Sequence, residues 1–517
     1  MKKASAFVAS VAVMGLMTAP LAAFSDDTIR WARDGDIDSL DPHRATSTLS
    51  RMTWLQIYDT LLEFDDDGNV VPNLAHDWSV ADDGRRITFE LHDDIVCHDG
   101  NQFTAEDVRF TAERALGKRD RDRSITASSW GPIDRVEVVD DLTVAFHLEQ
   151  PFAAFVPFMA DEFASMICKS MEGDEDFGRR TAVGTGPWAL VEWDRGNRVL
   201  LRAHEDFVNH GMPIDNDGPP LMDYLDIRVM PEGQTRYSAL QTGQVDMIVP
   251  PIDDVPRIDE SPDHELHIAR PTGQNMFIEF ATSRPPFDDV RGRQAVAHAL
   301  DFDAAIEIVF GDLVDREHCP ISGGVLGHDP EFCRAHSPEY DPERARALLD
   351  ELGYGPGNPA EIVMMTWHGD NRDRMLQVFQ SQLAQVGVQA EIEVMDIGTL
   401  NARVTTENRR EEGRGSLDLM GWTWFDPDLL HLLWHSPGAY EGYTHPDLDE
   451  LLARTRTTLD EEDRVEVVQQ VFAHLLENAV HVPVYSPGWL WMYAVNTDLK
   501  GFKVSAFDRP IFNGVHR

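Results

Sequence analysis

The densest group of aromatic side chains lies in the segment Gly421-Trp422-Thr423-Trp424-Phe425-Asp426-Pro427-Asp428. Rigid rings beside a glycine turn can form a wall that buries ligand surface at little entropy cost, and a neighbouring carboxylate can hold a cationic group. We therefore select Trp424 as the first candidate for ligand binding, with Trp422, Phe425 and Asp426 as further candidates. The alternatives are that Trp422 and Phe425 belong to the core, and that Asp426 only forms a turn before proline.

Two histidines, His431 and His435, are spaced so that one face of a helix would present both to a metal ion. The segment lacks the glutamate of the zinc-protease pattern, and two ligands alone make a weak site, so we predict no metal site. Neither a Gly-x-Ser-x-Gly nor a His-Glu-x-x-His motif occurs in the sequence. We therefore predict no catalytic residues and no cofactor; the rival class is a secreted hydrolase.

The amino terminus has the pattern of an export signal. Met1-Lys2-Lys3 precedes an apolar run from Ala4 to Met17, and small residues follow up to Ala23. The run is shorter than the roughly 20 apolar residues that span a bilayer, so we expect a signal peptide over 1–23 and a soluble, periplasmic mature chain.

An exported chain can form disulfides, and four cysteines are present. Cys319 and Cys333 are close in sequence, so we predict a bridge between them, which would contribute about 3 kcal/mol in the chain-entropy model. Cys97 and Cys168 either pair or stay buried as small apolar side chains.

The composition excludes one class of partner. The chain of 517 residues carries 90 Asp and Glu against 45 Lys and Arg, a net charge of −45. Binding of nucleic acid needs a basic surface that this chain lacks, so we expect none.

Six of the basic residues are lysines, which leaves 45 − 6 = 39 arginines. An acidic, arginine-rich surface suggests a halophilic protein exposed to high salt; the alternative is an ordinary acidic protein.

The order of the predicted elements indicates two lobes. The first part is rich in strands, such as Arg86–Leu91 and the hairpin over 136–148, and a helix is expected after the N-cap Thr104. Later, helices over 291–300, 342–352, 372–386, 448–459 and 461–478 alternate with strands over 360–367 and 389–394. This alternation is typical of an α/β lobe, and the absence of a long linker favours two lobes joined by short crossings.

Several stretches, in order along nearly the whole mature chain, resemble the extracytoplasmic solute-binding proteins of family 5, the dipeptide, oligopeptide and nickel receptors of ABC importers. The stretches are Tyr58–Leu62, Pro72–Ala75 with Trp78, His98–Gly100, Phe103–Val108, Gly184–Trp188, Ala239–Asp246 and Pro286–Ala295.

The resemblance implies a two-lobed α/β periplasmic binding protein (type II, cluster C) with an extra β-rich subdomain. The expected boundaries are 24–60, 185–270 and 485–517 for lobe I, 61–184 for its extra subdomain, and 271–484 for lobe II. It also implies a receptor, not an enzyme, that captures a peptide-like solute and delivers it to an inner-membrane ABC permease. Alternative solutes are an oligosaccharide, an opine-like or glutathione-like conjugate, or chelated nickel, and we expect a monomer.

The resemblance further places the segment around Trp424 beside the ligand. In peptide-binding members this segment usually carries one more acidic residue, which this sequence lacks, so dipeptide specificity is not implied. Trp367 and Arg372 flank the comparable strand-to-helix loop, where Arg372 either binds a carboxylate or begins the helix. Asn275 and Arg51 are further pocket candidates because they lie near lobe crossings.

Overall fold

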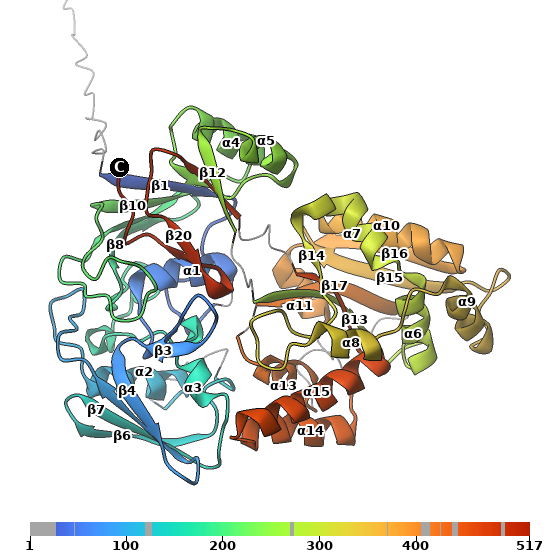
Figure 1. Ribbon diagram of the computed structural model, residues 1–517, viewed down its shortest axis with the longest axis horizontal. Coiled ribbons are helices and arrows are strands. Elements are labelled where there is room, and N and C mark those ends of the chain that lie inside the picture. The colour runs from blue at the N-terminus through green and yellow to red at the C-terminus, as the bar shows by residue number, and fades with distance from the viewer. Residues whose placement is uncertain are drawn as a thin grey trace, which may run out of the picture.

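The computed structural model describes residues 27–45, 47–118, 127–268, 273–369, 371–404, 414–423, 425–436, 443–486 and 492–517. The predicted signal peptide and Trp424 lie outside these residues. Within them the chain forms two lobes that lie side by side, each built on its own β-sheet (Figure 1). None of the helices in this part of the chain is long and apolar enough to cross a membrane.

The sheet of lobe I has seven strands in the order β12-β19-β11-β1-β10-β9-β8. Its strands are β1 (Thr28–Arg33), β8 (Trp188–Asp194), β9 (Arg198–Ala203), β10 (Tyr224–Val229), β11 (Met247–Ile248), β12 (His264–Ile268) and β19 (Met492–Asn496). The central strand β1 is parallel to β10 and β11, and the other pairs are antiparallel. Its helices are α1 (Thr48–Ile57), α4 (Gly233–Gln241) and α5 (Val255–Asp259), whereas α3 (Phe155–Phe158) packs against the smaller sheet of this lobe.

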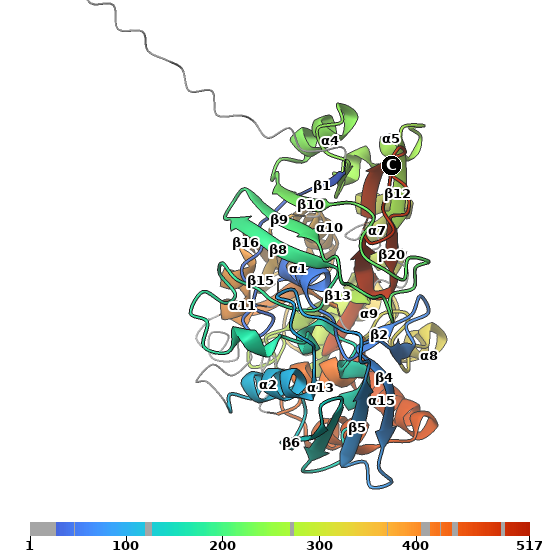
Figure 2. The ribbon, with the colours of Figure 1, turned by 90° about the vertical axis from the view of Figure 1, so that its left-hand side faces the viewer.

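A subdomain with its own four-stranded antiparallel sheet, β4-β5-β7-β6, lies below the main sheet of lobe I (Figure 2). Its elements are β4 (Ala75–Val80), β5 (Arg86–Leu91), α2 (Ala105–Ala115), β6 (Ile133–Asp140) and β7 (Thr143–Leu148). Two short ribbons complete lobe I: β2 (Leu62–Phe64) with β3 (Val70–Pro72), and β20 (Lys503–Ser505) with β21 (Arg509–Ile511).

The sheet of lobe II has six strands in the order β14-β18-β13-β17-β15-β16. They are β13 (Gln274–Phe280), β14 (Asp315–Arg316), β15 (Ala360–Trp367), β16 (Val388–Met395), β17 (Gly415–Thr423) and β18 (His481–Ser486). Helices lie on both sides of this sheet (Figure 1), as expected for an α/β lobe. They are α6 (Val290–Ala299), α7 (Phe302–Phe310), α8 (Pro330–His336), α9 (Pro342–Glu351), α10 (Arg372–Gln385), α11 (Ile397–Val404), α13 (Asp428–Trp434), α14 (Pro446–Thr457) and α15 (Glu461–Glu477).

The two faces of this second sheet are packed differently. Met276, Ile278 and Phe280 alternate along β13 and join the core beneath α6, α7, α9 and α10. Asn275 and Phe277 point to the other face, toward α8, α13 and α15. The candidate site therefore lies on the second face, where polar and aromatic side chains share the surface of the sheet.

Aspartates begin many of the helices. Asp301, Asp341 and Asp460 each accept a hydrogen bond from a backbone N–H in the first turn of α7, α9 and α15, respectively. A carboxylate at this position satisfies an otherwise unpaired N–H and faces the positive end of the helix dipole. Part of the acidic composition is thus used for helix capping.

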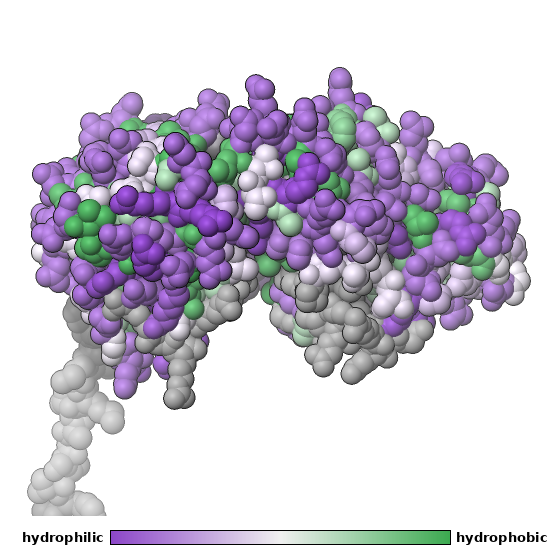
Figure 3. Space-filling model, turned by 90° about the horizontal axis from the view of Figure 1, so that it is seen from below, coloured by the Kyte–Doolittle hydropathy of each residue, from purple (hydrophilic) through white to green (hydrophobic). Residues whose placement is uncertain are grey.

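Figure 3 shows a surface of mostly hydrophilic residues on both lobes, with hydrophobic residues only in small groups.

Candidate functional site

Asn275 and Trp422 lie directly opposite each other on β13 and β17. Residues opposed in an antiparallel pair share one face of the sheet, so both side chains point to the same side. They line a small pocket together with Gly273, Phe277, Pro320, Ile321, Ser322, Val325 and Leu429. The neighbouring Gly421 faces the opposite side of the sheet, where a Cβ would lie 2.2 Å from the sulfur of Met276. The structure therefore brings together two of the predicted ligand-binding residues.

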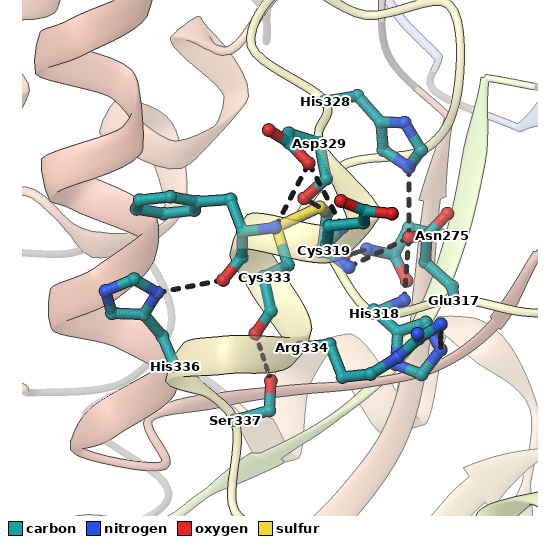
Figure 4. The surroundings of a disulfide bond; sticks show 12 residues. Asn275, Glu317, His318, Cys319, His328, Asp329, Cys333, Arg334, His336 and Ser337 are labelled. Carbon is teal, nitrogen blue, oxygen red and sulfur yellow. Dashed lines mark hydrogen bonds and ion pairs between the residues drawn. A yellow bond between two sulfur atoms is a disulfide. The ribbon is translucent and has the colours of Figure 1, made fainter.

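The orientation of the Asn275 amide is fixed by the loop that follows β14. Its Nδ2 donates to the carbonyl oxygen of Cys319 at 2.7 Å, as Figure 4 shows. Its Oδ1 is buried and has no hydrogen-bond partner among the described residues. Because Nδ2 already donates to Cys319 while Oδ1 has no partner among these residues, this side of the pocket offers a hydrogen-bond acceptor.

A disulfide between Cys319 and Cys333 holds this loop, with an S–S distance of 2.04 Å. The carboxylate of Glu317 accepts the backbone N–H of Cys319 at 2.8 Å and lies 3.1 Å from Nε2 of His328 (Figure 4). The bridge therefore anchors the segment that carries Pro320 to Val325, one wall of the pocket. A second disulfide joins Cys97 to Cys168 in the subdomain, which resolves the alternative that the sequence left open.

Phe425 extends from lobe II toward lobe I. Its ring centroid lies 5.5 Å from that of Phe64 and 6.5 Å from that of Phe158. A backbone hydrogen bond of 2.7 Å from Ala153 to the carbonyl of Arg456 joins the lobes nearby. Phe425 thus contributes to an apolar contact between the lobes. Trp424, the preceding residue and first candidate, cannot be placed from the described residues.

Asp426 is buried in an ion pair inside lobe II. Both of its oxygens accept from the guanidinium of Arg464, at 2.7 and 2.8 Å. Oδ1 also accepts the backbone N–H of Asp428, the first residue of α13, at 2.8 Å. Burial alone would lower the pKa of Arg464, but the charge and hydrogen bonds of Asp426 raise it. Asp426 therefore holds α13 and α15 together beside the aromatic segment.

Arg372 begins α10, which matches one of the two alternatives for this residue. Its guanidinium lies over the ring of Trp367 at 3.8 Å and donates to the carbonyl oxygens of Trp367 and His368. Only 1 % of Arg372 is exposed, whereas Trp367 is partly exposed. The pair forms a cation–π contact that fixes the strand-to-helix loop.

Arg51 lies in α1 of lobe I and is part of a buried charged network. It pairs with Glu162 and lies 3.9 Å from Asp161, with its guanidinium over the ring of Phe163. Burial, and then the charge of Glu162, raise the pKa of Asp161 well above its usual range. Arg509 also pairs with Glu162, so two arginines balance these acids.

His431 and His435 stack with ring centroids 4.2 Å apart. Burial, and then the charge of Arg456, lower the pKa of His431 to about 3, so this imidazole is neutral near pH 7. No third histidine, cysteine or acid within the described residues completes a metal-binding group with them.

Two lobes on separate sheets, with chain crossings between β12 and β13 and between β18 and β19, define the class of two-lobed solute-binding proteins. The model of the bacterial extracellular solute-binding proteins, family 5, matches residues 69–442. The chain belongs to this family, whose members are the substrate-binding proteins of ABC importers.

Relatives and solved structures agree with this assignment. The glutathione-binding protein GsiB of Pectobacterium atrosepticum is 29 % identical over 472 residues, which cover 88 % of each chain. The dipeptide-binding protein of Pseudoalteromonas sp. SM9913 in complex with Met-Leu superposes with a TM-score of 0.81 at 22 % identity, covering 95 % of this chain and 100 % of the other. AgaA of A. tumefaciens R10 in complex with agropinic acid gives a TM-score of 0.78 at 23 % identity, with 95 % and 98 % covered.

Proposed function

We propose that this protein is an exported receptor that captures a peptide-like solute between its lobes and delivers it to an ABC permease. The most informative observation is the Asn275 amide, whose Nδ2 donates to the Cys319 carbonyl while its buried Oδ1 has no partner among the described residues. A peptide offers backbone N–H groups and an ammonium group, and either satisfies such an acceptor. The names of relatives, among them a glutathione-binding protein and a dipeptide-binding protein, support the same class of solute.

The aromatic residues supply the apolar wall of the proposed site. Trp422 is only partly buried and lies beside the Asn275 amide, and Trp367 is also partly exposed. We include Trp424 and Phe425 in this wall, since they follow Trp422 directly in the chain. A ring against one face of the solute and an amide at its edge provide contact area together with one oriented hydrogen bond.

The predicted charged candidates act in this proposal as positioning residues. Asp426 is bound by Arg464, Arg372 by carbonyl oxygens of its own loop, and Arg51 by Glu162. Taking a buried charge away from its partner is unfavourable, so these groups are poor anchors for solute charges. We infer that recognition depends on hydrogen bonds and aromatic contact, and glutathione and short peptides are the first solutes to test.

A thermal-shift screen in high salt, followed by calorimetric titration, tests the proposal. The screen compares glutathione, glutathione disulfide, dipeptides and tripeptides with oligosaccharides, opines and a nickel–histidine chelate. A solute that binds only the native state raises the unfolding temperature. We expect a shift with a peptide-like solute and no chemical turnover. A shift only with a sugar or a chelate, or turnover of the solute, would refute the proposal.

Variants at the pocket test its location. Asn275→Ala and Trp422→Ala should each weaken binding at least tenfold, equivalent to about 1.4 kcal/mol. Trp78→Ala, in β4 of the subdomain, is the matched control and should leave the affinity unchanged. Equal affinities for the wild type and both pocket variants would place the solute elsewhere.

The cellular setting is part of the same proposal. Residues 1–23 are removed on export, the mature receptor is a periplasmic monomer, and it binds no nucleic acid. Removal of Lys2 and Lys3 changes the charge balance to 43 − 90 = −47. Amino-terminal sequencing of the exported protein and light scattering test cleavage after Ala23 and the oligomeric state. Closure about the two chain crossings would enclose the solute.

A further inference from the structure

Two histidines of the subdomain and one from the main body of lobe I lie together where these two parts meet. His76 lies in β4, His92 directly follows β5, and His210 lies in the loop after β9. The rings of His92 and His210 stack with centroids 3.5 Å apart and 11° between their planes, and the ring of His76 lies 5.3 Å from that of His92. The carboxylate of Asp94 is 2.9 Å from Nε2 of His210.

The local backbone positions each of these side chains. The pairing of β4 with β5 has an irregularity between Ala75 and Asp77, at His76, and such bulges redirect a side chain. The backbone N–H of His92 donates to Leu74 at 3.1 Å, which ties the two strands together beside the cluster. Gly211 keeps the His210 loop close, since a Cβ there would lie 2.8 Å from the carbonyl oxygen of Pro72.

We propose that His92, Asp94 and His210 bind a divalent transition-metal cation of the Zn²⁺ class, with His76 as a fourth ligand. One ligand atom from each of the first three residues lies within 4.8 Å of the others. Tetrahedral Zn²⁺ with bonds of about 2.0–2.1 Å holds its ligand atoms about 3.4 Å apart. Because the rings of His92 and His210 are stacked face to face, one ring must also rotate so that a nitrogen of each points to the cation, which partly exposed side chains can do.

The chemistry of the group fits this cation. Imidazole nitrogens with one carboxylate oxygen suit Zn²⁺, Cu²⁺ or Ni²⁺ better than Mg²⁺ or Ca²⁺, which prefer oxygen ligands alone. In the bound state the cation would replace the proton between His210 and Asp94.

Two other groups of possible metal ligands occur within the described residues, but their cysteines cannot bind a metal. Cys97, Asp107 and Cys168 form one, and Glu317, Cys319 and His328 form the other. Every cysteine in these groups is part of a disulfide, so no thiolate is available as a ligand. None of the ligands in the histidine group is part of a disulfide. Its cation would cross-link the subdomain to the main body of lobe I, away from the proposed solute site.

Metal titration of the untagged, metal-free receptor tests this proposal. We expect the receptor to take up one equivalent of Zn²⁺ in competition with a chromophoric chelator, and its unfolding temperature to rise. His92→Gln and His210→Gln should each weaken binding at least tenfold. His147→Gln is the matched control, since His147 contacts Glu137 at 2.6 Å without a second histidine ligand, and it should bind as the wild type does.

A second control is His431→Gln, which disrupts a histidine stack without an acid at metal-binding distance. Thermal unfolding of each variant without metal shows whether it folds, and visible absorption of the Co²⁺ form reports nitrogen and oxygen ligands. No Zn²⁺ uptake by the wild type, or equal uptake by the His92→Gln/His210→Gln double variant, would overturn the proposal. Solute affinity should be the same in all these variants, so this result is independent of the peptide-binding proposal.

Discussion

Replacing Arg464 by methionine should destabilise lobe II strongly, because it removes the partner of a buried charge. The guanidinium of Arg464 donates two parallel hydrogen bonds to Asp426 and a third, of 2.9 Å, to the carbonyl of Thr455. The side chains of Arg464 and Asp426 are only 5 % and 3 % exposed. Methionine fills a similar volume but leaves the carboxylate of Asp426 buried without a counter-charge.

The size of the effect follows from the geometry. Two unit charges about 4 Å apart attract each other by about 4 kcal/mol at an effective dielectric constant of about 20. Removing one member of a buried pair typically costs about 3–5 kcal/mol. We therefore expect Arg464→Met to lower the free energy of unfolding by about 3–5 kcal/mol. The double variant Asp426→Leu/Arg464→Met should recover much of this loss, which gives a coupling energy of at least about 2 kcal/mol.

Chemical denaturation in molar salt measures these differences, since salt screens buried pairs much less than exposed ones. Arg346→Met is the matched control, because Arg346 pairs with Glu343 at 2.6 Å on the exposed face of α9, and it should change stability by less than about 1 kcal/mol. If Arg464→Met unfolds like the wild type, the reasoning is wrong. If Asp426→Asn keeps full stability but loses solute binding, Asp426 is a ligand anchor after all.

Three further predictions concern the whole molecule. Replacing Cys97 and Cys168 by serine opens a longer loop and should cost about 4 kcal/mol, against about 3 kcal/mol for Cys319 and Cys333. Only the second change should also weaken solute binding, because its loop holds Asn275; calorimetry of both variants checks this. Burial lowers the pKa of His481 to about 3. Between about pH 6.5 and 3 this histidine is therefore protonated in the unfolded state and neutral in the native state. Stability should therefore decrease as the pH is lowered through that window, and His481→Phe should reduce the slope by up to about 1.4 kcal/mol per pH unit in denaturation curves. The large excess of acidic residues should make the receptor less stable in dilute buffer than in molar salt, and equal unfolding temperatures in both would refute a salt requirement.

Local patterns in the sequence predicted the local structure well. The strand expected over Arg86–Leu91 has those bounds as β5, and Thr104 is the N-cap of α2. The hairpin expected over 136–148 is formed by β6 and β7, and the α/β alternation of the second half is confirmed. These features depend on neighbours within a few residues, through capping and through the alternation of polar and apolar side chains.

The partners of the candidate residues could not be predicted in the same way. Arg464 lies 38 positions from Asp426, and Cys319 lies 44 positions from Asn275. His210 is 116 positions from Asp94, so nothing in either segment alone indicates a shared site. The spacing of His431 and His435 within one helix is visible in the sequence. The proposed metal site is not, because His210 comes from a different part of lobe I than His92 and Asp94.

The ion pairs also explain why the large negative charge says little about the solute. Near the proposed site, Asp426 is matched by Arg464, and Glu162 is matched by both Arg51 and Arg509. These two acids are balanced inside the fold and add no net charge near the proposed site. A site built from Asn275 and aromatic rings then favours a solute whose own charges are balanced, such as a zwitterionic peptide, over a strongly cationic one. We therefore propose that the charge of the receptor reflects the salt of its environment, and that the uncharged residues of the proposed pocket select its solute.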